Sequence, residues 1–292
     1  MDNTSVGRGV VLILGAILLF VVLEAQAKAA GQMMPVLQVV WARYSVHFVL
    51  LVLWFGPRMG RGLVRTRHPG MQVLRSFLLL GTTIMTFLSL RFLQMAEVTA
   101  LALSVPFFVA ALSVPMLGER VGPHRWAAIC IGFLGVLIVV RPGTGLFQPA
   151  VLLPVIGAVL LAFYMIITRK ISADEDPVVS VFFTALAGAV VLTAAIPFVW
   201  QTPSEPLGYL LMLGVGLSGG FGHYLLILAT RHAPASLLAP YYYSQIFGSI
   251  LVGYLLFRDL PDGFTLAGAG VIVCAGLYLW IRERRAAQRS VR

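Results

Sequence analysis

Long apolar runs separated by short polar segments are the dominant pattern of the chain. Most of these runs hold about 20 residues, the length that an α-helix needs to cross the hydrocarbon core of a bilayer. Gly and Pro are concentrated in the separators, as at Gly56-Pro57 and Pro261-Asp262-Gly263, where they favour turns. The pattern predicts an all-α integral membrane protein with ten transmembrane helices. The expected spans are 8–30, 36–55, 70–92, 96–117, 124–141, 150–170, 177–200, 207–230, 233–257 and 263–282.

The first apolar run follows Arg8, as the apolar core of a signal peptide would. The run is longer than such a core, however, and Glu24 and Lys28 stand where small residues would mark a cleavage site. We therefore interpret it as the first transmembrane helix.

Composition excludes the soluble and disordered classes. Of the 292 residues, 59% are hydrophobic and only 11% are charged, whereas soluble domains have about 25% charged residues. Disordered chains require low hydrophobicity, which this chain does not have. Ten spans leave only short loops, so we expect no sizeable soluble domain and the lipid bilayer as the main partner.

The formal net charge of +10 comes from cations grouped between the apolar runs. Such loop charges orient membrane proteins, so we expect no nucleic-acid partner. With a cytoplasmic N-terminus, 16 Lys and Arg residues, Arg75 among them, fall in cytoplasmic segments and four on the other side. These four are Lys28, Arg91, Arg141 and Arg258. This predicts a multi-pass protein of the plasma (inner) membrane with both termini in the cytoplasm.

Two stretches of the chain are similar at an offset of about 140 residues. The segment from Ala96 through Leu117-Gly118-Glu119 into a Gly-rich helix is echoed from Ala233 through Phe257-Arg258-Asp259 into another. We expect two five-helix repeats, at 1–145 and 146–292, the second ending in a basic cytoplasmic tail. Because five is an odd number, the second repeat enters the membrane from the opposite side. Inverted repeats of this kind are common in secondary transporters.

The pattern from Ala96 through Leu117-Gly118-Glu119-Arg120 to Gly132 and Gly135, with its echo after Ala233, resembles the drug/metabolite transporter superfamily. Within it, the whole chain is similar to the ten-helix EamA-type members, although Arg258-Asp259 replaces the usual Gly-Glu in the second copy. The resemblance implies a secondary transporter that works by alternating access around a central cavity between the repeats. A YddG-like exporter of neutral or aromatic amino acids is the first expectation. The alternative is an importer of a metabolite such as S-adenosylmethionine or a nucleotide-linked compound, and a membrane-embedded enzyme or sensor is the distant alternative.

Sequence signatures of enzymes are missing from the chain. It contains no Gly-x-x-x-x-Gly-Lys-[Ser/Thr] stretch of an ATPase and no HExxH motif of an intramembrane hydrolase. Cys130 and Cys274 both lie inside apolar runs, where we expect them to be buried rather than to form a zinc site or a disulfide. We therefore expect no enzyme activity, no metal site and no cofactor.

Ionisable residues inside the spans are costly in lipid and indicate functional positions. Glu24 and Lys28 are spaced i, i+4 in the first span, and Arg43 and His47 have the same spacing in the second. Glu24 and Arg43 are expected at similar depth, so one hypothesis is an ion pair between them that lines the cavity. The alternative is that Glu24 pairs only with Lys28 while Arg43 extends to the membrane surface. Few cations are expected to line the cavity, which suits a zwitterionic or weakly charged solute.

The ninth span holds the main substrate-binding candidates. Tyrosine offers an apolar face together with a hydroxyl, and plain aromatic packing is the alternative role. The candidates there are Tyr241, Tyr242, Tyr243 and Gln245, and those in other spans are Trp41, Tyr44, Ser104 and His223. For His223 two roles stay open, a proton-linked group and a neutral histidine hydrogen-bonded between helices.

Proline and glycine inside spans are the predicted hinges, at Pro106, Pro240, Gly219 and Gly220. The Gly-rich run 218–223 either allows close helix packing or marks a flexible stretch near a binding site. Two halves in one chain can supply a whole pathway, so we expect a functional monomer. The sequence leaves the substrate, the direction of transport and proton coupling open.

Overall fold

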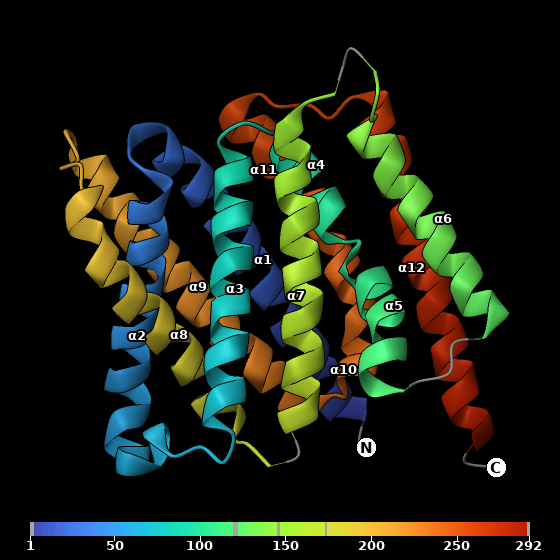
Figure 1. The fold of residues 1–292 in the computed structure, drawn as a ribbon, viewed down its shortest axis with the longest axis horizontal. Helices are drawn as coiled ribbons and strands as arrows, with labels where there is room; N and C mark the ends of the chain where they lie inside the picture. The colour runs from blue at the N-terminus through green and yellow to red at the C-terminus, as the bar shows by residue number, and fades with distance from the viewer. Residues whose placement is uncertain (1–2, 119–121, 145–146, 173, 291–292) are drawn as a thin grey trace.

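The computed structural model describes residues 3–118, 122–144, 147–172 and 174–290, and every regular element in these ranges is helical. The helices stand side by side in one bundle (Figure 1). The α-helices are α1 (Asn3–Met33), α2 (Val36–Met59), α3 (Pro69–Leu90), α4 (Met95–Ala102), α5 (Val105–Leu117), α6 (Pro123–Val140), α7 (Leu152–Ile171), α8 (Pro177–Ala195), α9 (Pro206–His232), α10 (Ala235–Leu238), α11 (Gln245–Phe257) and α12 (Gly263–Ser290). The short 3-10 segments are η1 (Gly60–Val64), η2 (Pro149–Val151), η3 (Ile196–Phe198) and η4 (Ala239–Ser244).

Nine of the described helical segments are long and apolar enough to cross a membrane. The protein is therefore a multi-pass, all-α membrane protein, as its hydropathy pattern predicts. The expected span 233–257 is divided into α10, η4 and α11, none of which reaches that length by itself. Both termini lie at one end of the bundle, together with α10, while α11 lies near the other (Figure 1). We call these the terminal end and the far end.

Proline sets the start of several helices, as the separators predict. It costs no hydrogen bond there, because the first N–H groups of a helix have no intrahelical acceptor. The residues concerned are Pro69, Pro123, Pro177 and Pro206. At the start of α8 the Asp176 carboxylate also accepts a hydrogen bond of 2.7 Å from the backbone N–H of Val178, which caps that helix.

Gly118 and Arg258 end α5 and α11 in the same left-handed conformation, with φ of 68° and 59°. Glycine adopts this conformation without a steric penalty, whereas an L-residue with a side chain rarely does. The departure of the second copy at Arg258 therefore changes the residue but keeps the backbone turn.

Two spans are interrupted, and each interruption lies beside a predicted proline. Between α4 and α5 the chain breaks at Leu103 and Ser104, two residues before Pro106, and the Ser104 hydroxyl donates to the Leu101 carbonyl at 2.5 Å. Pro240 lies within η4, the 3-10 segment between α10 and α11. The hinge role of these prolines stays a prediction.

Contacts between the first and second halves of the chain occur in matched pairs. α1 packs on α9 as α3 packs on α7, α2 on α9 as α3 on α8, and α1 on α11 as α5 on α7. In chain order, α1, α2, α3 and the α4–α5 segment of the first half correspond to α7, α8, α9 and the α10–α11 segment of the second. Replacing each helix by its counterpart converts the first contact of each pair into the second. α6 packs on α12, its own counterpart, where a Cβ added to Gly268 would lie 2.8 Å from the carbonyl oxygen of Gly135.

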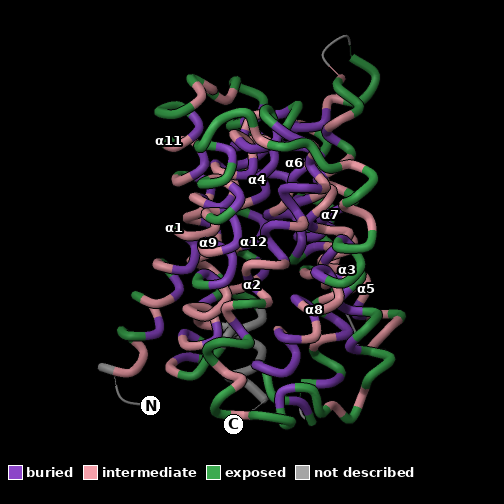
Figure 2. The backbone as a smooth tube through the Cα atoms, turned by 90° about the vertical axis from the view of Figure 1, so that its left-hand side faces the viewer, coloured by how far each residue is buried: buried purple, intermediate pink, exposed green. Residues whose placement is uncertain are grey.

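Buried residues run through the middle of the bundle, and exposed residues follow its periphery and its two ends (Figure 2). Large apolar side chains such as Val11, Leu53 and Phe247 are exposed on the outside, as expected of a surface that faces lipid. The expectation that both cysteines are buried is wrong: Cys130 on α6 and Cys274 on α12 are exposed. A helix formed from an apolar run has one face toward lipid and another toward the protein core. Hydropathy alone does not show on which face a residue lies.

Candidate functional site

Arg43 lies in the interior of the bundle on α2, with only 8% of its surface exposed. Its Nη1 donates a hydrogen bond of 2.6 Å to the Thr83 hydroxyl of α3. Its guanidinium also lies over the rings of Tyr44 and Phe87, at 5.1 and 5.8 Å from their centroids. The Arg43 Nε is buried and has no hydrogen-bond partner among the described residues. Arg43 thus stays inside the bundle instead of extending to the membrane surface.

His47, one turn further along α2, stacks on His223 of α9. Their ring centroids are 5.6 Å apart and the ring planes lie within 5° of each other. Phe20 of α1 meets His223 edge-on, with centroids 5.3 Å apart. Within the part of the chain that the structure describes, the buried His47 Nε2 has no hydrogen-bond partner. The predicted residue His223 therefore sits between α1 and α2, next to the Arg43 turn.

Glu24 of α1 lies in a second polar cluster, with residues of α4 and α11. Its carboxyl group accepts hydrogen bonds from the Gln245 amide at 2.8 Å, the Thr99 hydroxyl at 3.2 Å and the Ser249 hydroxyl at 3.3 Å. The two hydroxyls are 2.7 Å apart. The structure thus brings the predicted residues Glu24 and Gln245 together. Thr99 and Ser249 gave no usable signal in the sequence, because single hydroxyl residues are ordinary in apolar helices.

The two expected ion pairs of Glu24 are wrong: among the described residues, it pairs neither with Arg43 nor with Lys28. Lys28 instead forms an ion pair of 2.6 Å with Asp259 and donates to the Leu93 carbonyl at 2.8 Å. Spacing along one helix predicts depth, but packing against α11 decides the side to which each group turns. Glu24 and Arg43 therefore lie in the interior without a partner of opposite charge.

Gly219 of α9 relates the two clusters to each other. A Cβ added there would lie 3.4 Å from the Arg43 Nε and 3.9 Å from the Leu23 side chain. Arg43 is thus at the level of Leu23, the residue before Glu24. The expectation that Glu24 and Arg43 share a depth agrees with this packing, although they face different neighbours.

Arg75 is the centre of a dense polar network in the interior, so the expectation that it is one of the cations of the cytoplasmic segments is wrong. It lies on α3 and is 1% exposed. It donates to Gln72 Oε1 at 2.9 Å, Thr168 Oγ1 at 3.1 Å, the Ser180 carbonyl at 2.7 Å and the Tyr164 hydroxyl at 2.6 Å. These bonds join α3 of the first half to α7 and α8 of the second. A cation early in an apolar run resembles an interfacial residue, and its partners lie far away in the sequence.

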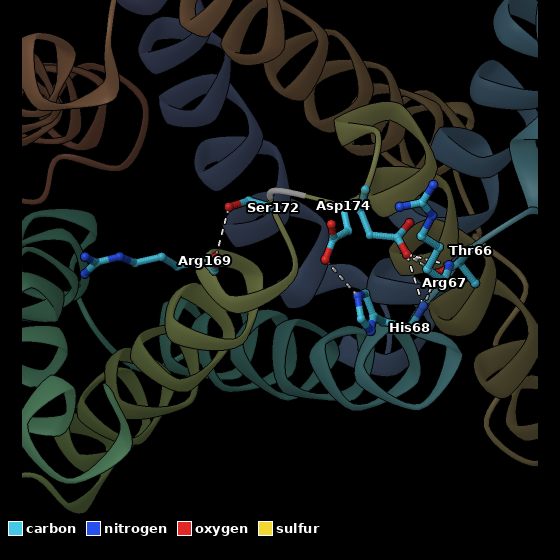
Figure 3. Close-up of polar contacts among 7 residues, drawn as sticks. Thr66, Arg67, His68, Arg169, Ser172 and Asp174 are labelled. Carbon is cyan, nitrogen blue, oxygen red and sulfur yellow. Dashed lines mark hydrogen bonds and ion pairs between the residues drawn. The ribbon is translucent and has the colours of Figure 1, made fainter. Parts of the chain in front are cut away.

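Two loops meet at the terminal end, in the cluster drawn in Figure 3. The Glu175 carboxylate accepts hydrogen bonds from the Thr66 hydroxyl at 2.6 Å, Arg67 N at 2.7 Å and His68 N at 3.1 Å. His68 also contacts Asp174 at 3.4 Å. Burial by itself raises the pKa of Glu175, but these hydrogen bonds outweigh it and hold the pKa below its ordinary value. The cluster closes the terminal end between α2–α3 and α7–α8.

Different contacts join helices and loops at the far end. Gln38 of α2 exchanges two hydrogen bonds of 2.9 Å with the backbone of Gln201, and Arg141 forms an ion pair of 2.6 Å with Asp262. Burial alone raises the pKa of Asp262, but bonds from Thr265 and Arg141 lower it below its ordinary value. A pocket of about 200 Å³ opens beside this pair, lined by Gln94, Glu97, Val139, Val140, Arg141, Gln148, Val151 and Asp262.

Of three predicted substrate residues in other spans, Tyr44 belongs to the Arg43 cluster, since its ring lies beneath the guanidinium and its hydroxyl is 3.0 Å from that of Thr83. Trp41 donates to Thr193 at 2.9 Å and meets Trp200 edge-on, on the α8 side of α2. Tyr44 is 2% exposed, and its ring fills the space beside Gly188. Ser104 is fully buried at the helix break. Their roles in binding stay predictions.

The three tyrosines of η4 point to different surroundings, as their consecutive positions require. Tyr241 and Tyr242 pack on the apolar cluster around Ile13 and Ile17 of α1. Tyr243 is buried against Gly276 of α12. Gln245 is the member of this predicted group that reaches Glu24.

The Gly-rich run 218–223 lies inside α9, which continues without a break from Pro206 to His232. A Cβ at Gly216 would come 2.3 Å from the Val46 Cβ, and one at Gly222 would come 2.7 Å from the Phe20 ring. Glycine thus allows α9 to pack closely on α1 and α2, the first of the two predicted alternatives. Flexibility at Gly219 and Gly220 stays a prediction.

Comparison with known proteins gives two matches to one family. The sequence model of the EamA-like transporter family matches residues 7–141 and again residues 148–281.

Three relatives illustrate the substrates that similar proteins are named for. The chain is 29% identical to an S-adenosylmethionine uptake transporter of Rickettsia bellii, over 92% of this chain and 91% of that protein. It is 27% identical to a riboflavin transporter of Vibrio cholerae, over 97% of each chain. It is also 27% identical to the pseudopaline exporter CntI of Pseudomonas aeruginosa, over 93% of this chain and 95% of that protein. These names cover different solutes and both an uptake and an export protein.

Proposed function

The chain belongs to the EamA-like transporter family, and from this premise we propose that it is a secondary transporter that moves a small amphoteric metabolite by alternating access. Family membership and the transporter names of its relatives make it a small-molecule transporter rather than an enzyme. The mechanism, the substrate and the direction are the parts that we propose.

The proposed architecture is ten spans in two inverted five-helix repeats, residues 1–145 and 146–292. The second family match, at 148–281, supports this division. The matched contacts between the halves support a two-fold relation, and the common end of both termini supports an even number of crossings (Figure 1). In this arrangement α10, η4 and α11 form the ninth span. One chain then supplies the whole pathway, so the proposed functional unit is a monomer.

We propose that the protein lies in the inner membrane of the cell and that its terminal end faces the cytoplasm. Cations such as Arg58, Arg61, Arg65 and Arg67 gather at that end, and an excess of cations is typical of cytoplasmic loops. Removing Arg75, which is buried, from the count of loop cations leaves the excess on the same side.

The observation that carries the substrate class is the pair of unneutralised charges Glu24 and Arg43. An isolated buried charge is unfavourable unless a partner or a ligand compensates it. S-Adenosylmethionine has cationic groups for Glu24 and an anionic group for Arg43, and its uptake is what several relatives are named for. It is the leading candidate. Neutral aromatic amino acids are the second, because Tyr241 and Tyr242 lie half-buried close in sequence to Gln245, which binds Glu24.

Counterflow into liposomes tests this proposal. Liposomes are loaded with unlabelled S-adenosylmethionine, riboflavin or tryptophan, and entry of the same labelled compound is followed without an imposed gradient. We expect transient accumulation of S-adenosylmethionine or tryptophan, and its loss in Glu24→Gln. The matched control is Glu205→Gln, since Glu205 is exposed and makes no capping bond at the start of α9. Accumulation of riboflavin alone would contradict the amphoteric substrate class, because riboflavin has no such charges.

A further inference from the structure

Arg43 differs from the other cations that the described part of the bundle buries. Lys28 is paired with Asp259, Arg141 with Asp262, and Arg75 has four hydrogen bonds. Arg43 has no partner of opposite charge among the described residues: it donates to the neutral Thr83 and contacts the neutral Tyr44, and its Nε is unpartnered although only 8% of the residue is exposed. The rings of Tyr44 and Phe87 offer π faces to the guanidinium. Such contacts compensate only part of a buried charge.

The unpartnered atoms of Arg43 and His47 share one direction. A Cβ at Gly219 would lie 3.4 Å from Arg43 Nε, and a Cβ at Gly220 would lie 3.3 Å from His47 Cδ2, the ring atom bonded to the unpartnered Nε2. Both groups therefore face α9 where two consecutive residues carry no side chain. His223 of α9 stacks on His47 at the same place.

We propose that Arg43, together with His47 and His223, binds the carboxylate of the transported solute between α2 and α9. This inference rests on the proposed transport function and names the group that the solute must carry. The guanidinium supplies charge and a fork of N–H donors that matches a carboxylate, and His47 Nε2 is a further donor when it carries the proton.

A carboxylate fits this position better than a phosphate. Arg43 has an unpartnered nitrogen and no ion pair among the described residues, and its Nη1 is already bonded to Thr83. Arg141, whose Nε is also unpartnered, is instead neutralised by Asp262. Arg75 is fully engaged by α7 and α8. A phosphate with two negative charges needs more cations than this subsite holds, whereas one carboxylate charge is balanced by one guanidinium.

The position also links binding to the movement that transport requires. Arg43 belongs to the first half of the chain and Gly219 and Gly220 to the second, and in this structure the two helices touch there. A carboxylate enters only when α9 moves away from α2, which is a displacement of one half against the other. Side chains at residues 219 and 220 would occupy the space that the ligand needs.

Two pairs of compounds that differ only in the carboxylate test the inference. S-Adenosylmethionine is compared with its decarboxylated form, and tryptophan with tryptamine. Each is measured as an inhibitor of counterflow and as a ligand that raises the Tm of the purified protein. In the wild type we expect the carboxylate compound of the transported pair to act about 10- to 100-fold more strongly, the range expected for a hydrogen-bonded charge pair.

Arg43→Gln should reduce this preference to less than about threefold, mainly by weakening the carboxylate compound. Arg43→Lys keeps the charge but loses the fork, so an intermediate preference is expected. The matched control is Arg91→Gln, because Arg91 is exposed at the end of α3 and, among the described residues, only its backbone forms hydrogen bonds, to Leu88 and from Gln32. Its preference should equal that of the wild type.

The outcomes separate the subsite from the function. An unchanged preference in a folded Arg43→Gln protein would overturn the carboxylate subsite while leaving transport in place. A Tm increase that depends on the carboxylate and on Arg43, without flux, would support the subsite and contradict the transport proposal. Neither flux nor a Tm increase with any of the four compounds would overturn both.

Discussion

Arg43 and Arg75 are two guanidinium groups buried in neighbouring helices, and their surroundings differ sharply. Arg75 is bonded through Nε, Nη1 and Nη2 and joins three helices. Arg43 bonds to the neutral Thr83 but keeps an unpartnered Nε, which faces Gly219 of α9. Burial alone therefore does not identify a functional charge. A better indicator is the number of N–H donors that have no protein partner, because unpartnered donors favour the binding of a ligand.

The largest expected effect is the loss of Arg75. Arg75→Gln removes the guanidinium that donates to the Thr168 hydroxyl, the Tyr164 hydroxyl and the Ser180 carbonyl, so each of these interior acceptors loses a hydrogen bond. We expect the free energy of unfolding to fall by about 2–4 kcal/mol, measured as a lower Tm of the protein in detergent. An Arg75→Gln protein as stable as the wild type would show that this network does not hold the halves together.

A smaller loss is expected where α9 packs on α2. In Gly216→Ala the new methyl group would meet the Val46 Cβ at 2.3 Å, and since this atom is fixed to the backbone, the helices must separate. Such overpacking costs about 1–3 kcal/mol. Gly219→Ala is the matched control, because its methyl group would stand at ordinary contact distance, 3.4 Å from the Arg43 Nε. It should keep the Tm and reduce flux, whereas equal Tm losses in both variants would contradict the assigned packing.

Much of the fold follows from the sequence because length and hydropathy control it. Apolar runs bounded by Gly and Pro predict most helix ends to within about five residues, although α12 continues to Ser290, past the expected end at 282. Pro106 and Pro240 mark the interrupted spans. The break at η4 has a local cause, since Pro240 donates no backbone hydrogen bond. These features depend on residues close together in the chain, which is why the pattern predicts them.

The site was less predictable because partners lie far apart in the chain. Glu24 is bonded to Thr99, Gln245 and Ser249, so its partners come from two other helices, α4 and α11, that lie far from α1 in the chain. Spacing fixes the depth of a residue, but the rotation of its helix depends on packing against the others. The hydroxyl partners of Arg75 likewise form no recognisable pattern in the sequence, so the burial of Arg75 was not predicted.

The two ends of the bundle can be compared through the hydrogen bonds of Glu175, which depend on its ionised form. The lowered pKa of Glu175 means that its bonds to Thr66, Arg67 and His68 are present above the ordinary glutamate value, about 4.3, and are lost as pH falls through the lower folded value. At pH 7, Glu175→Ala should speed amide exchange at residues 67 and 68 about tenfold, which corresponds to about 1.4 kcal/mol.

Asp174→Asn is the control for this change, since within the described ranges the Asp174 side chain bonds the His68 ring, at 3.4 Å, and not the backbone of residues 67 and 68. Its amide exchange at residues 67 and 68 should match the wild type after correction for the intrinsic rate. The far end, held by Gln38 and Gln201, should exchange alike in all three proteins. Faster exchange at both ends in Glu175→Ala would contradict a local closing role and indicate general loosening of the bundle.

The smallest expected effect is on the stability of Arg43→Gln, and it completes the comparison with Arg75. The variant loses the bond to Thr83 but also removes a buried charge that no described carboxylate neutralises. These contributions oppose each other, so the free energy of unfolding should change by less than about 1 kcal/mol, with a Tm close to that of the wild type. A Tm loss as large as that of Arg75→Gln would contradict the distinction, because Arg43 would then be as necessary to the fold as Arg75. An unchanged Tm together with a lost carboxylate preference would mean that the protein keeps a buried charge that its fold does not need.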